Sequence, residues 1–600
     1  MRWFSGVIKL DHSELSQEEI EQINHKPANT LNYPVYKHHV IQKSFAFFVI
    51  DSSLDHNPVT FCNNCYLVGD VRIDNREELL ALLPLSEKDM SDEQLILRLV
   101  QEKGPDVFTL IVGEFSFFMW DTAFQQILLV RDQLGIKTLF WTLQGTTLYI
   151  ASDIFLMESC INMKRLNDEY FIDFYKSDGN PDSEHTPFKD LFRVRSGTRV
   201  LIDSKGVSSR CYWSISNVNH SICYQDLSEY TEHLFHLLTE SVRCRLSEAH
   251  PNAVMMSGGL DSTTVFAIAQ YLSKLNPDYH TIAISGVFDL HKSCDEREFI
   301  IPVLEQYNAD PYYEICDDYG IFRNFPHDTP FLFEPAVNAA SYAFTRALIA
   351  RCAKEGAKTI LTGYAGDHVM GGSEAVLADL AGQFKIKDLF LHIYPFALKC
   401  RLSLPKVLWH SAIAPHLGGG IFKDWITNRK LEYIHELRRI KTFNQKDFYR
   451  QISGTKSRIF SDRVIAAEFG VDISHPFLDR RLIEFLYSIP GELRWNAGTP
   501  KWLLRRTMEN KLPDEIIWRK NKTGHLSLTF QGLRQSWPQL YAAVRKGRVS
   551  QFGLIELEKW RQALEQWRQG YLTRGDLWVL LAIEIWLYRL EQKLTAALPT

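Results

Sequence analysis

In V-M-M-S-G-G-L-D-S-T-T, residues 254–264, an apolar run stops at two glycines and polar residues follow. An apolar, helix-like segment, V-F-A-I-A, continues over 265–269. Gly258 and Gly259 remove side chains at a place where the backbone must approach another group closely. The helix that follows would present unpaired N–H groups and the positive end of its dipole. This order of strand, loop and helix predicts a phosphate-binding site.

The loop differs from the common phosphate-binding loop, because the pattern G-x-x-x-x-G-K-[ST] is absent. Asp261 would repel a phosphate unless a cation lay between them. Magnesium suits that place, since it takes oxygen ligands and phosphate together. A plain turn is the alternative interpretation of such a short pattern.

A second glycine turn ends the strand-like stretch K-T-I-L-T-G-Y-A-G-D at 358–367. Further strands are expected at 253–256 and 280–288, with a helix near 296–307. Strands that alternate with helices indicate a parallel sheet, whose ligands usually bind beyond the carboxyl ends of the strands. Both glycine turns are expected at that end.

The first 210 or so residues are β-rich, with short apolar runs separated by turn residues. One helix is expected after Ser91, a suitable N-cap. We expect sheets covered by helices, followed by a polar linker at 214–221. Cys62 and Cys65 form C-N-N-C, which is interpreted as two strands around an Asn-Asn turn because no second metal-ligand pair accompanies it.

The composition is that of a soluble protein of more than one domain: 600 residues, 45% hydrophobic, with a net charge of −5. No chain-wide basic signal indicates nucleic acid or membrane. The apolar stretch at 577–590 contains Glu584 and Arg589 and is too short to span a bilayer, so a buried helix is expected. Ten scattered cysteines and the lack of a signal peptide favour a reducing, cytoplasmic location.

Motifs along nearly the whole chain resemble the asparagine synthetase-like superfamily. S-G-G-L-D-S is similar to the loop of enzymes that cleave ATP to AMP and pyrophosphate. G-E-F-S-F-F-M-W-D resembles the amidotransferase domain of asparagine synthetases. Three further motifs resemble the synthetase domain of those enzymes: L-T-G-Y-A-G-D-H-V-M-G-G, K-W-L-L-R-R and L-P-D-E-I-I-W-R-K-N-K-T-G. The resemblance implies an α/β protein: an Ntn-hydrolase-like αββα sandwich over 1–213, and a parallel-sheet synthetase domain of the adenine-nucleotide α-hydrolase type over 222–600.

The chain departs from that pattern at its start. Glutamine-using members expose a cysteine at residue 2, whereas this chain has Arg2 and no cysteine before Cys62. Ser5 is a hydroxyl without an evident base. We therefore expect an inactive glutaminase domain, in which four motif residues are structural: Gly69, Asp70, Arg72 and Asn75.

The second departure is His368, where asparagine synthetases usually have a glutamate after the aspartate that corresponds to Asp367. Tyr364 resembles the tyrosine of β-lactam and carbapenam synthetases, which deprotonates a nitrogen nucleophile together with a carboxylate. That partner is undecided between Glu432 and Glu436, and Tyr364 could instead only pack against the loop. Whether His368 is catalytic stays open.

Residues 381–445 have a local charge of +7, with eleven Lys or Arg and four Asp or Glu. These residues are interpreted as a helical insertion, with either solvated helix faces or a surface for an acidic or extended substrate. An absent glutaminase, an ATP site and this insertion together resemble lasso-peptide macrolactam synthetases. Those enzymes join an Asp or Glu side chain of a peptide to its N-terminal amine.

The resemblance also implies roles for single residues. Asp261 and Asp367 would hold Mg²⁺ against ATP, and Lys501 would stabilise charge in the transition state. Asp295 and Glu296 are either structural or near the substrate. Loop residues would cradle the nucleotide and its pyrophosphate: Ser257, Gly258, Gly259, Ser262 and Gly363.

Expected partners are a precursor peptide and, in such a pathway, a leader-binding protein and a leader peptidase. The alternatives are a small-molecule cyclase such as β-lactam synthetase, an asparagine synthetase-like amide ligase, and a non-catalytic scaffold. Arg2 disfavours the glutamine-dependent enzyme, and the intact ATP motifs disfavour the scaffold.

Overall fold

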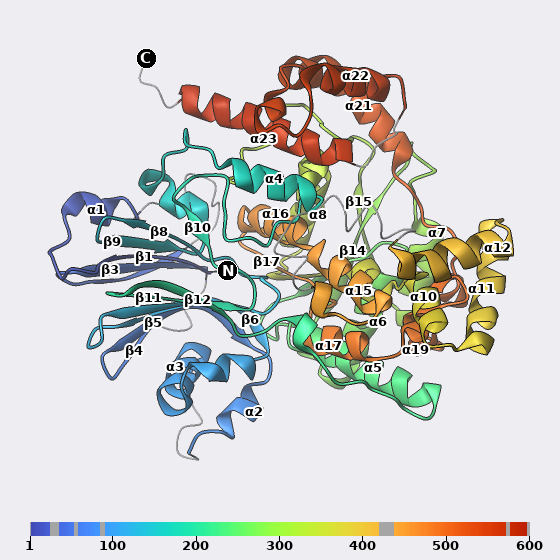
Figure 1. Cartoon of the computed structure of the whole chain (residues 1–600), viewed down its shortest axis with the longest axis horizontal. Helices are drawn as coiled ribbons and strands as arrows, with labels where there is room; N and C mark the ends of the chain where they lie inside the picture. Colours follow the sequence, from blue (N-terminus) through green and yellow to red (C-terminus); the bar gives the residue numbers. More distant parts are fainter. Residues whose placement is uncertain are drawn as a thin grey trace.

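The computed structural model describes residues 2–24, 35–52, 58–84, 90–418, 437–571 and 576–596. Two stacked sheets form one side of the molecule, and a parallel sheet surrounded by helices forms the other (Figure 1). The final helices lie across the top of both parts.

The two N-terminal sheets are antiparallel and have six strands each. In spatial order, the first contains β10 (Phe192–Arg193), β8 (Phe140–Gln144), β9 (Thr147–Ala151), β1 (Arg2–Lys9), β3 (Phe45–Asp51) and β2 (Tyr36–Ile41). The second contains β12 (Gly206–Cys211), β11 (Thr198–Asp203), β7 (Gln126–Arg131), β6 (Gly113–Asp121), β5 (Cys65–Ile73) and β4 (Val59–Cys62). Aromatic residues fill the core between the sheets, among them Phe4, Phe47, Phe118 and Trp120.

Helices cover the outer faces of this pair of sheets. α3 (Asp92–Lys103) begins at Ser91 with a capping box and packs on the second sheet. α4 (Asp168–Lys176) and α23 (Asp576–Ala596) pack on the first sheet. The predicted αββα sandwich is confirmed, and β4 and β5 form the hairpin expected around the Asn-Asn turn.

The synthetase part contains a five-stranded parallel sheet. Its spatial order is β15 (Pro311–Ile315), β14 (Thr281–Val287), β13 (Asn252–Met255), β16 (Thr359–Thr362) and β17 (Asp472–Ser474). The helices that connect and flank these strands are α5 (Leu227–Arg243), α6 (Leu260–Leu275), α7 (Arg297–Tyr307) and α8 (Tyr342–Lys354). Because β13 and β16 are neighbours in parallel register, the two glycine turns that follow them lie side by side.

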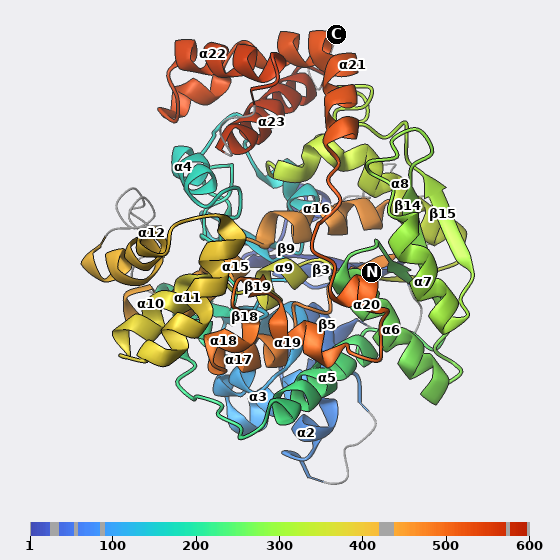
Figure 2. The same cartoon turned by 90° about the vertical axis from the view of Figure 1, so that its right-hand side faces the viewer.

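Further helices build the rest of the synthetase part. They include α9 (Gly366–Met370), α10 (Ala375–Gly382), α11 (Ile386–Cys400), α12 (Leu404–Val407), α15 (Phe443–Ser453), α16 (Lys456–Ala467), α17 (Arg480–Ser488), α19 (Trp502–Thr507), α21 (Leu526–Val544) and α22 (Leu557–Arg568). The insertion is helical where the structure describes it, and α11 and α12 lie at the edge of the molecule (Figure 2). Residues 419–436 of the insertion lie outside the described residues.

The apolar stretch at 577–590 lies within α23 and is packed in the core, as predicted. Its Glu584 is fully buried and accepts a hydrogen bond from Arg548 Nη1 at 2.8 Å. In the part of the chain that the structure describes, no helix is long and apolar enough to cross a membrane. All ten cysteines are free thiols.

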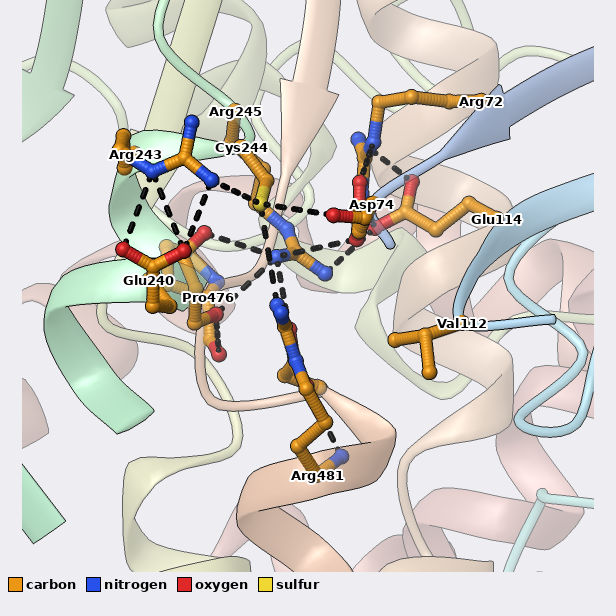
Figure 3. A network of polar contacts seen from close by, with 12 residues as sticks. Arg72, Asp74, Val112, Glu114, Glu240, Arg243, Cys244, Arg245, Pro476 and Arg481 are labelled. Carbon is orange, nitrogen blue, oxygen red and sulfur yellow. Dashed lines mark hydrogen bonds and ion pairs between the residues drawn. The ribbon is translucent and has the colours of Figure 1, made fainter. Parts of the chain in front are cut away.

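Buried ion pairs join the two parts of the molecule (Figure 3). Arg245, just after the end of α5, lies with Nη2 3.0 Å from Glu114 Oε1 of β6 and Nη1 3.3 Å from Asp479 Oδ2. Glu114 also pairs with Arg72 of β5 at 2.9 Å. Removing one member would leave a buried charge without its partner, at a cost of about 3–5 kcal/mol. The two parts are therefore held in one fixed arrangement.

Candidate functional site

The predicted phosphate loop connects β13 to α6. Ser257 donates its backbone N–H to Ser262 Oγ at 3.0 Å, and the two side-chain oxygens are 3.1 Å apart. Gly259 is the N-cap of α6 and provides no side-chain cap. The first-turn N–H groups of this 16-residue helix are therefore left for another acceptor, as an anion-binding site requires.

The second glycine turn, after β16, packs directly against the first turn of α6. A Cβ at Gly363 would lie 2.5 Å from the backbone nitrogen of Ser262, and one at Gly366 would lie 2.3 Å from Cγ of Asp261. Only glycine permits this close approach. The contact brings Asp261 of the first turn next to Asp367 of the second, as predicted.

Lys501 lies between the two carboxylates. Its Nζ is 2.6 Å from Asp261 Oδ2 and 2.5 Å from Asp367 Oδ1. Lys501 is the N-cap of α19 and has a left-handed backbone, with φ of 58°. Such backbone strain in a residue other than glycine is concentrated at functional sites. Lys522, which the sequence reasoning missed, contacts the other oxygen of Asp367 at 2.6 Å.

Burial and neighbouring charges set the protonation of this cluster. Burial raises the pKa of the Asp261 carboxyl, and the ammonium of Lys501 opposes this effect. Burial acts in the same way on Asp367, but Lys501 and Lys522 outweigh it and hold the pKa of that carboxyl well below its usual range. A buried carboxylate beside a second carboxylate requires a nearby cation.

The two carboxylates fit a magnesium ion bound together with ATP. Asp261 Oδ1 is buried and has no hydrogen-bond partner among the described residues. The described part of the chain holds no group of three or more His, Cys, Asp or Glu suited to a metal. Magnesium is typically held by one or two carboxylates, with phosphate and water completing its shell. The donor set at Asp261 and Asp367 matches that pattern.

Two residues shape the loop from outside. Glu296 Oε2 accepts a hydrogen bond from Gly258 N at 3.1 Å, and Arg519 donates to the Gly258 carbonyl at 2.7 Å and to Glu296 Oε1 at 2.9 Å. Asp295 instead accepts from Phe288 N at 3.0 Å, within its own loop. Glu296 therefore contacts the nucleotide loop, whereas Asp295 has a structural contact. The sequence reasoning missed Arg519, although this residue lies in the family-like motif L-P-D-E-I-I-W-R-K-N-K-T-G.

Tyr364 is packed beside the second turn. Its hydroxyl donates to the Thr455 carbonyl at 3.0 Å, and the Arg458 guanidinium lies 4.8 Å from the centre of its ring. Burial raises the pKa of this hydroxyl, although Arg458 opposes the effect. Within the described residues, no carboxylate is bonded to the hydroxyl. The two candidates for its partner, Glu432 and Glu436, lie outside those residues, so a catalytic role for Tyr364 stays a prediction.

A cavity of about 670 Å³ adjoins this site. His368, the residue after Asp367, lines it, and its Nδ1 is buried without a hydrogen-bond partner among the described residues. One wall is formed by residues 173–195 of the N-terminal part and the other by residues 447–454 of the synthetase part. We call this cavity the interdomain pocket.

Arg2 is fixed by ion pairs at the place of the missing nucleophile. Its Nε lies 2.7 Å from Asp51 Oδ2, and Nη1 also pairs with Glu93. Ser5 Oγ is buried and donates to the Ile23 carbonyl at 3.1 Å. A guanidinium cannot act as a nucleophile, and this hydroxyl is turned into the protein, so neither replaces the cysteine.

The amidotransferase motif residues make structural contacts. Asp70 pairs with Lys137 at 2.9 Å and with Arg463 of the synthetase part at 3.0 Å. The Asn75 side chain bonds to backbone groups of the turn before β6. The Gly69 carbonyl accepts from Arg2 Nη1 at 3.3 Å, and Arg72 belongs to the ion pairs of Figure 3. The motif residues therefore hold the domain together and join it to its neighbour.

Comparison with known proteins agrees with both parts of this description. The asparagine synthase family model matches residues 233–588, and the glutamine amidotransferase domain model matches residues 9–213. Amidase chry2 of Gibberella zeae is 23% identical over 545 residues, covering 79% of this chain and 78% of that protein. The glutamine-hydrolyzing asparagine synthetase 3 of Bacillus subtilis is 22% identical and covers 82% of each.

Among solved structures, glutamine phosphoribosylpyrophosphate amidotransferase from B. subtilis, complexed with ADP and GMP, matches 60% of this chain and 75% of its own. The identity is 10% and the TM-score is 0.23. The family assignment rests on the synthase model, which matches more than half of the chain. The chain therefore belongs to the asparagine synthase family, whose members are ATP-dependent carbon–nitrogen ligases.

Proposed function

We propose that this chain is an ATP- and Mg²⁺-dependent macrolactam synthetase that acts on a ribosomally made precursor peptide. It adenylates an Asp or Glu side chain of the peptide, and the N-terminal amine of the same peptide closes an isopeptide ring, as in lasso peptides. One observation carries the proposal: Arg2 is clamped in the nucleophile position of the amidotransferase domain, while the adenylation site is intact. A nitrogen carried by the acceptor itself requires no glutaminase, which agrees with this combination.

The loop and turn residues have different roles in binding ATP. The backbone and hydroxyls of residues 257–262 hold the pyrophosphate portion, and Gly363 contributes to the nucleotide site by letting the first turn of α6 pack against the second glycine turn. Asp261 and Asp367 would hold Mg²⁺, which neutralises phosphate charge when bound. Lys501 is aimed at the same point and stabilises charge that develops during both transfers.

The proposed reaction has two steps, adenylation and amide formation. The side-chain carboxylate attacks the α-phosphorus of ATP, and pyrophosphate leaves. The amine nitrogen then attacks the activated acyl carbon, AMP leaves, and one proton is lost from the nitrogen. Because the Tyr364 hydroxyl keeps its own proton, we propose that it relays: it passes its proton to a carboxylate partner while it takes up the proton from the nitrogen. Holding both ends of one peptide in a single site makes the second step effectively unimolecular.

The size of the interdomain pocket supports a large acceptor. Ammonia is about as large as water, which takes up roughly 30 Å³ in the liquid. A cavity of about 670 Å³ is far larger than ammonia needs and lies in the range of sites for sizeable ligands. This favours a peptide over the ammonia of a simple amide ligase.

A small-molecule cyclase of the β-lactam synthetase type is the second candidate. Tyr364 favours it as strongly as the first, because both mechanisms deprotonate an internal nitrogen. The peptide proposal additionally implies a leader-binding protein and a leader peptidase as partners of the pathway.

Synthetic linear peptides with a free amino terminus and one internal Asp or Glu test the proposal. With ATP and Mg²⁺, a cyclised product is lighter than its substrate by one water molecule and resists aminopeptidase. Acetylation of the amino terminus should abolish ring closure. A product formed from a small amino acid derivative, and none from any peptide, would favour the second candidate.

We expect ATP to be cleaved to AMP and pyrophosphate, and only when magnesium is present. The reason is the loop at 257–262, whose Asp261 lies beside Asp367 of the second glycine turn, with Lys501 between them. Separation of the nucleotides by ion-exchange chromatography, with EDTA as the control, measures this. Release of ADP would contradict the assignment of the loop.

We also expect no hydrolysis of glutamine. Arg2 and the buried hydroxyl of Ser5 leave the domain without a nucleophile at this position. Glutamate released from glutamine by the pure protein is compared with that from a heat-inactivated sample. Turnover above this background would show that another residue has taken over the role.

A further inference from the structure

The interdomain pocket has more negative than positive charge on its walls. Its acidic lining residues are Asp173, Asp178, Asp182, Glu184 and Asp447, and its arginines are Arg195 and Arg450. Cations also surround the Asp182 carboxyl: burial acts to raise its pKa, but Lys456, Arg131 and Arg195 outweigh this and lower it to about 2. That carboxylate is thus balanced by its own cations.

The two walls hold their carboxylates differently. Asp447 accepts hydrogen bonds from two neutral donors, Ser373 Oγ at 2.8 Å and Gln451 Nε2 at 3.1 Å, and the buried guanidinium of Arg494 is the cation that interacts with its charge. Glu184, on the opposite wall, is exposed, and no described residue forms a hydrogen bond or ion pair with its side chain. Carboxylates therefore lie on both sides of the pocket.

Two helices end at this pocket. Ser177 is the C-cap of α4 and Gly454 is the C-cap of α15, and both residues line the cavity. In Figure 2, α4 of the N-terminal part lies above α15 of the synthetase part. The C-terminus of a helix carries the negative end of its dipole and favours a cation. The carboxylates and the helix C-termini therefore both favour a positively charged ligand.

We infer that the interdomain pocket binds a short, positively charged segment of the acceptor peptide, and that residues 173–184 of the inactive amidotransferase domain select it by charge. The inference rests on the proposed function, because it places the acceptor on the His368 side of the adenylation site. The retained domain then has a role in catalysis by its neighbour, since it supplies one wall of a substrate site. An anionic segment in the same place would be repelled by both walls.

Two blocked peptides test this binding without any reaction. Acetyl-Gly-Lys-Gly-Lys-Gly amide and its Glu counterpart are titrated against the full chain, and binding is followed by saturation-transfer NMR of the peptide. We expect the Lys peptide to bind and the Glu peptide to bind at least several-fold more weakly. Added salt should reduce the difference, because exposed charges are screened over about 10 Å at roughly 0.1 M ionic strength.

The variant Glu184→Lys should weaken binding of the Lys peptide roughly tenfold, since one exposed charge attraction is exchanged for a repulsion of similar size. Glu184→Gln should cause a smaller loss. Glu77→Lys is the matched control: it makes the same charge change at an exposed residue of α2 (Arg76–Leu80), in the same domain but outside the pocket lining. Thermal unfolding verifies that all three variants are folded.

Equal binding of both peptides, binding of neither, or an equal loss in Glu184→Lys and Glu77→Lys would overturn the inference. Because no ATP is present, these outcomes do not depend on ring closure. If the chain prefers the Lys peptide but closes no ring, the proposed function is refuted and the charge-selective binding in the pocket is retained. If it cyclises peptides whatever their charge, the proposed function is retained and the charge-selective binding is refuted.

Discussion

Replacing Asp261 by Asn is expected to reduce ATP cleavage by about 10³-fold or more. The carboxylate lies 2.6 Å from Lys501 Nζ and has a second oxygen that is buried without a partner in the described structure. An amide keeps the shape but removes the charge that a magnesium ion needs. Electrostatic stabilisation by such an ion amounts to several kcal/mol, and each 1.4 kcal/mol or so changes a rate tenfold. Asp367→Asn should behave in the same way.

The measurement is pyrophosphate release at several magnesium concentrations. Excess magnesium should not restore the Asp261→Asn variant to more than a few per cent of the parent rate, because the ligand itself is missing. Asp278→Asn, an exposed change just beyond the far end of α6, is the matched control and should remain active. If Asp261→Asn retained more than about a tenth of the parent rate, Asp261 could not be a ligand of the ion.

The centre of the site could be predicted because its signals are local. S-G-G-L-D-S lies between an apolar run and a helix, and the second glycine turn also follows an apolar run. In a parallel sheet, both turns belong at the same edge, and pairing of β13 with β16 then brings Asp261 and Asp367 together. The packing of Gly363 against the first turn of α6 is the structural reason for the two patterns.

The surroundings of the site could not be predicted, because they depend on tertiary packing. Lys522 and Arg519 lie more than 150 residues from the groups they contact, in a stretch whose role only the fold reveals. The interdomain pocket is formed by residues 173–195 and 447–454, neither of which carries a recognisable motif. The partner of Tyr364 was left between two glutamates, and the described residues include neither.

The retained amidotransferase domain also shows the limit of motif reasoning. Its motif residues are present, but Asp70 now pairs with Arg463 of the neighbouring domain. Arg72 reaches the same interface through Glu114 and Arg245. Arg2 was enough to predict that the cysteine nucleophile was absent. The interdomain contacts join residues that are far apart in the sequence, so no local pattern predicts them.

Lys501→Ala is expected to fold, to bind ATP, and to lose ligation by about 10²–10³-fold, because one well-placed donor contributes roughly 3–4 kcal/mol to a transition state. Its ammonium is mostly buried and lies 2.5–2.6 Å from both carboxylates, so a neutral side chain cannot replace it. Lys522→Ala is the matched control. Lys522 contacts Asp367 at 2.6 Å, but its side chain is 78% exposed, and such pairs contribute about 1 kcal/mol or less. That variant should lose about fivefold or less.

Single-turnover rates, measured over a series of magnesium concentrations, separate two roles of Lys501. If the ammonium only offsets the repulsion between Asp261 and Asp367, a higher magnesium concentration should restore the Lys501→Ala rate. If it stabilises charge on the reacting groups, the loss should persist at saturating magnesium, and Lys501→Arg should recover part of the rate. We expect the second result, because both carboxylates would have magnesium as their counter-ion during the reaction and would leave the lysine free to contact the reacting oxygens. A loss below about fivefold at every magnesium concentration would remove Lys501 from the catalytic residues.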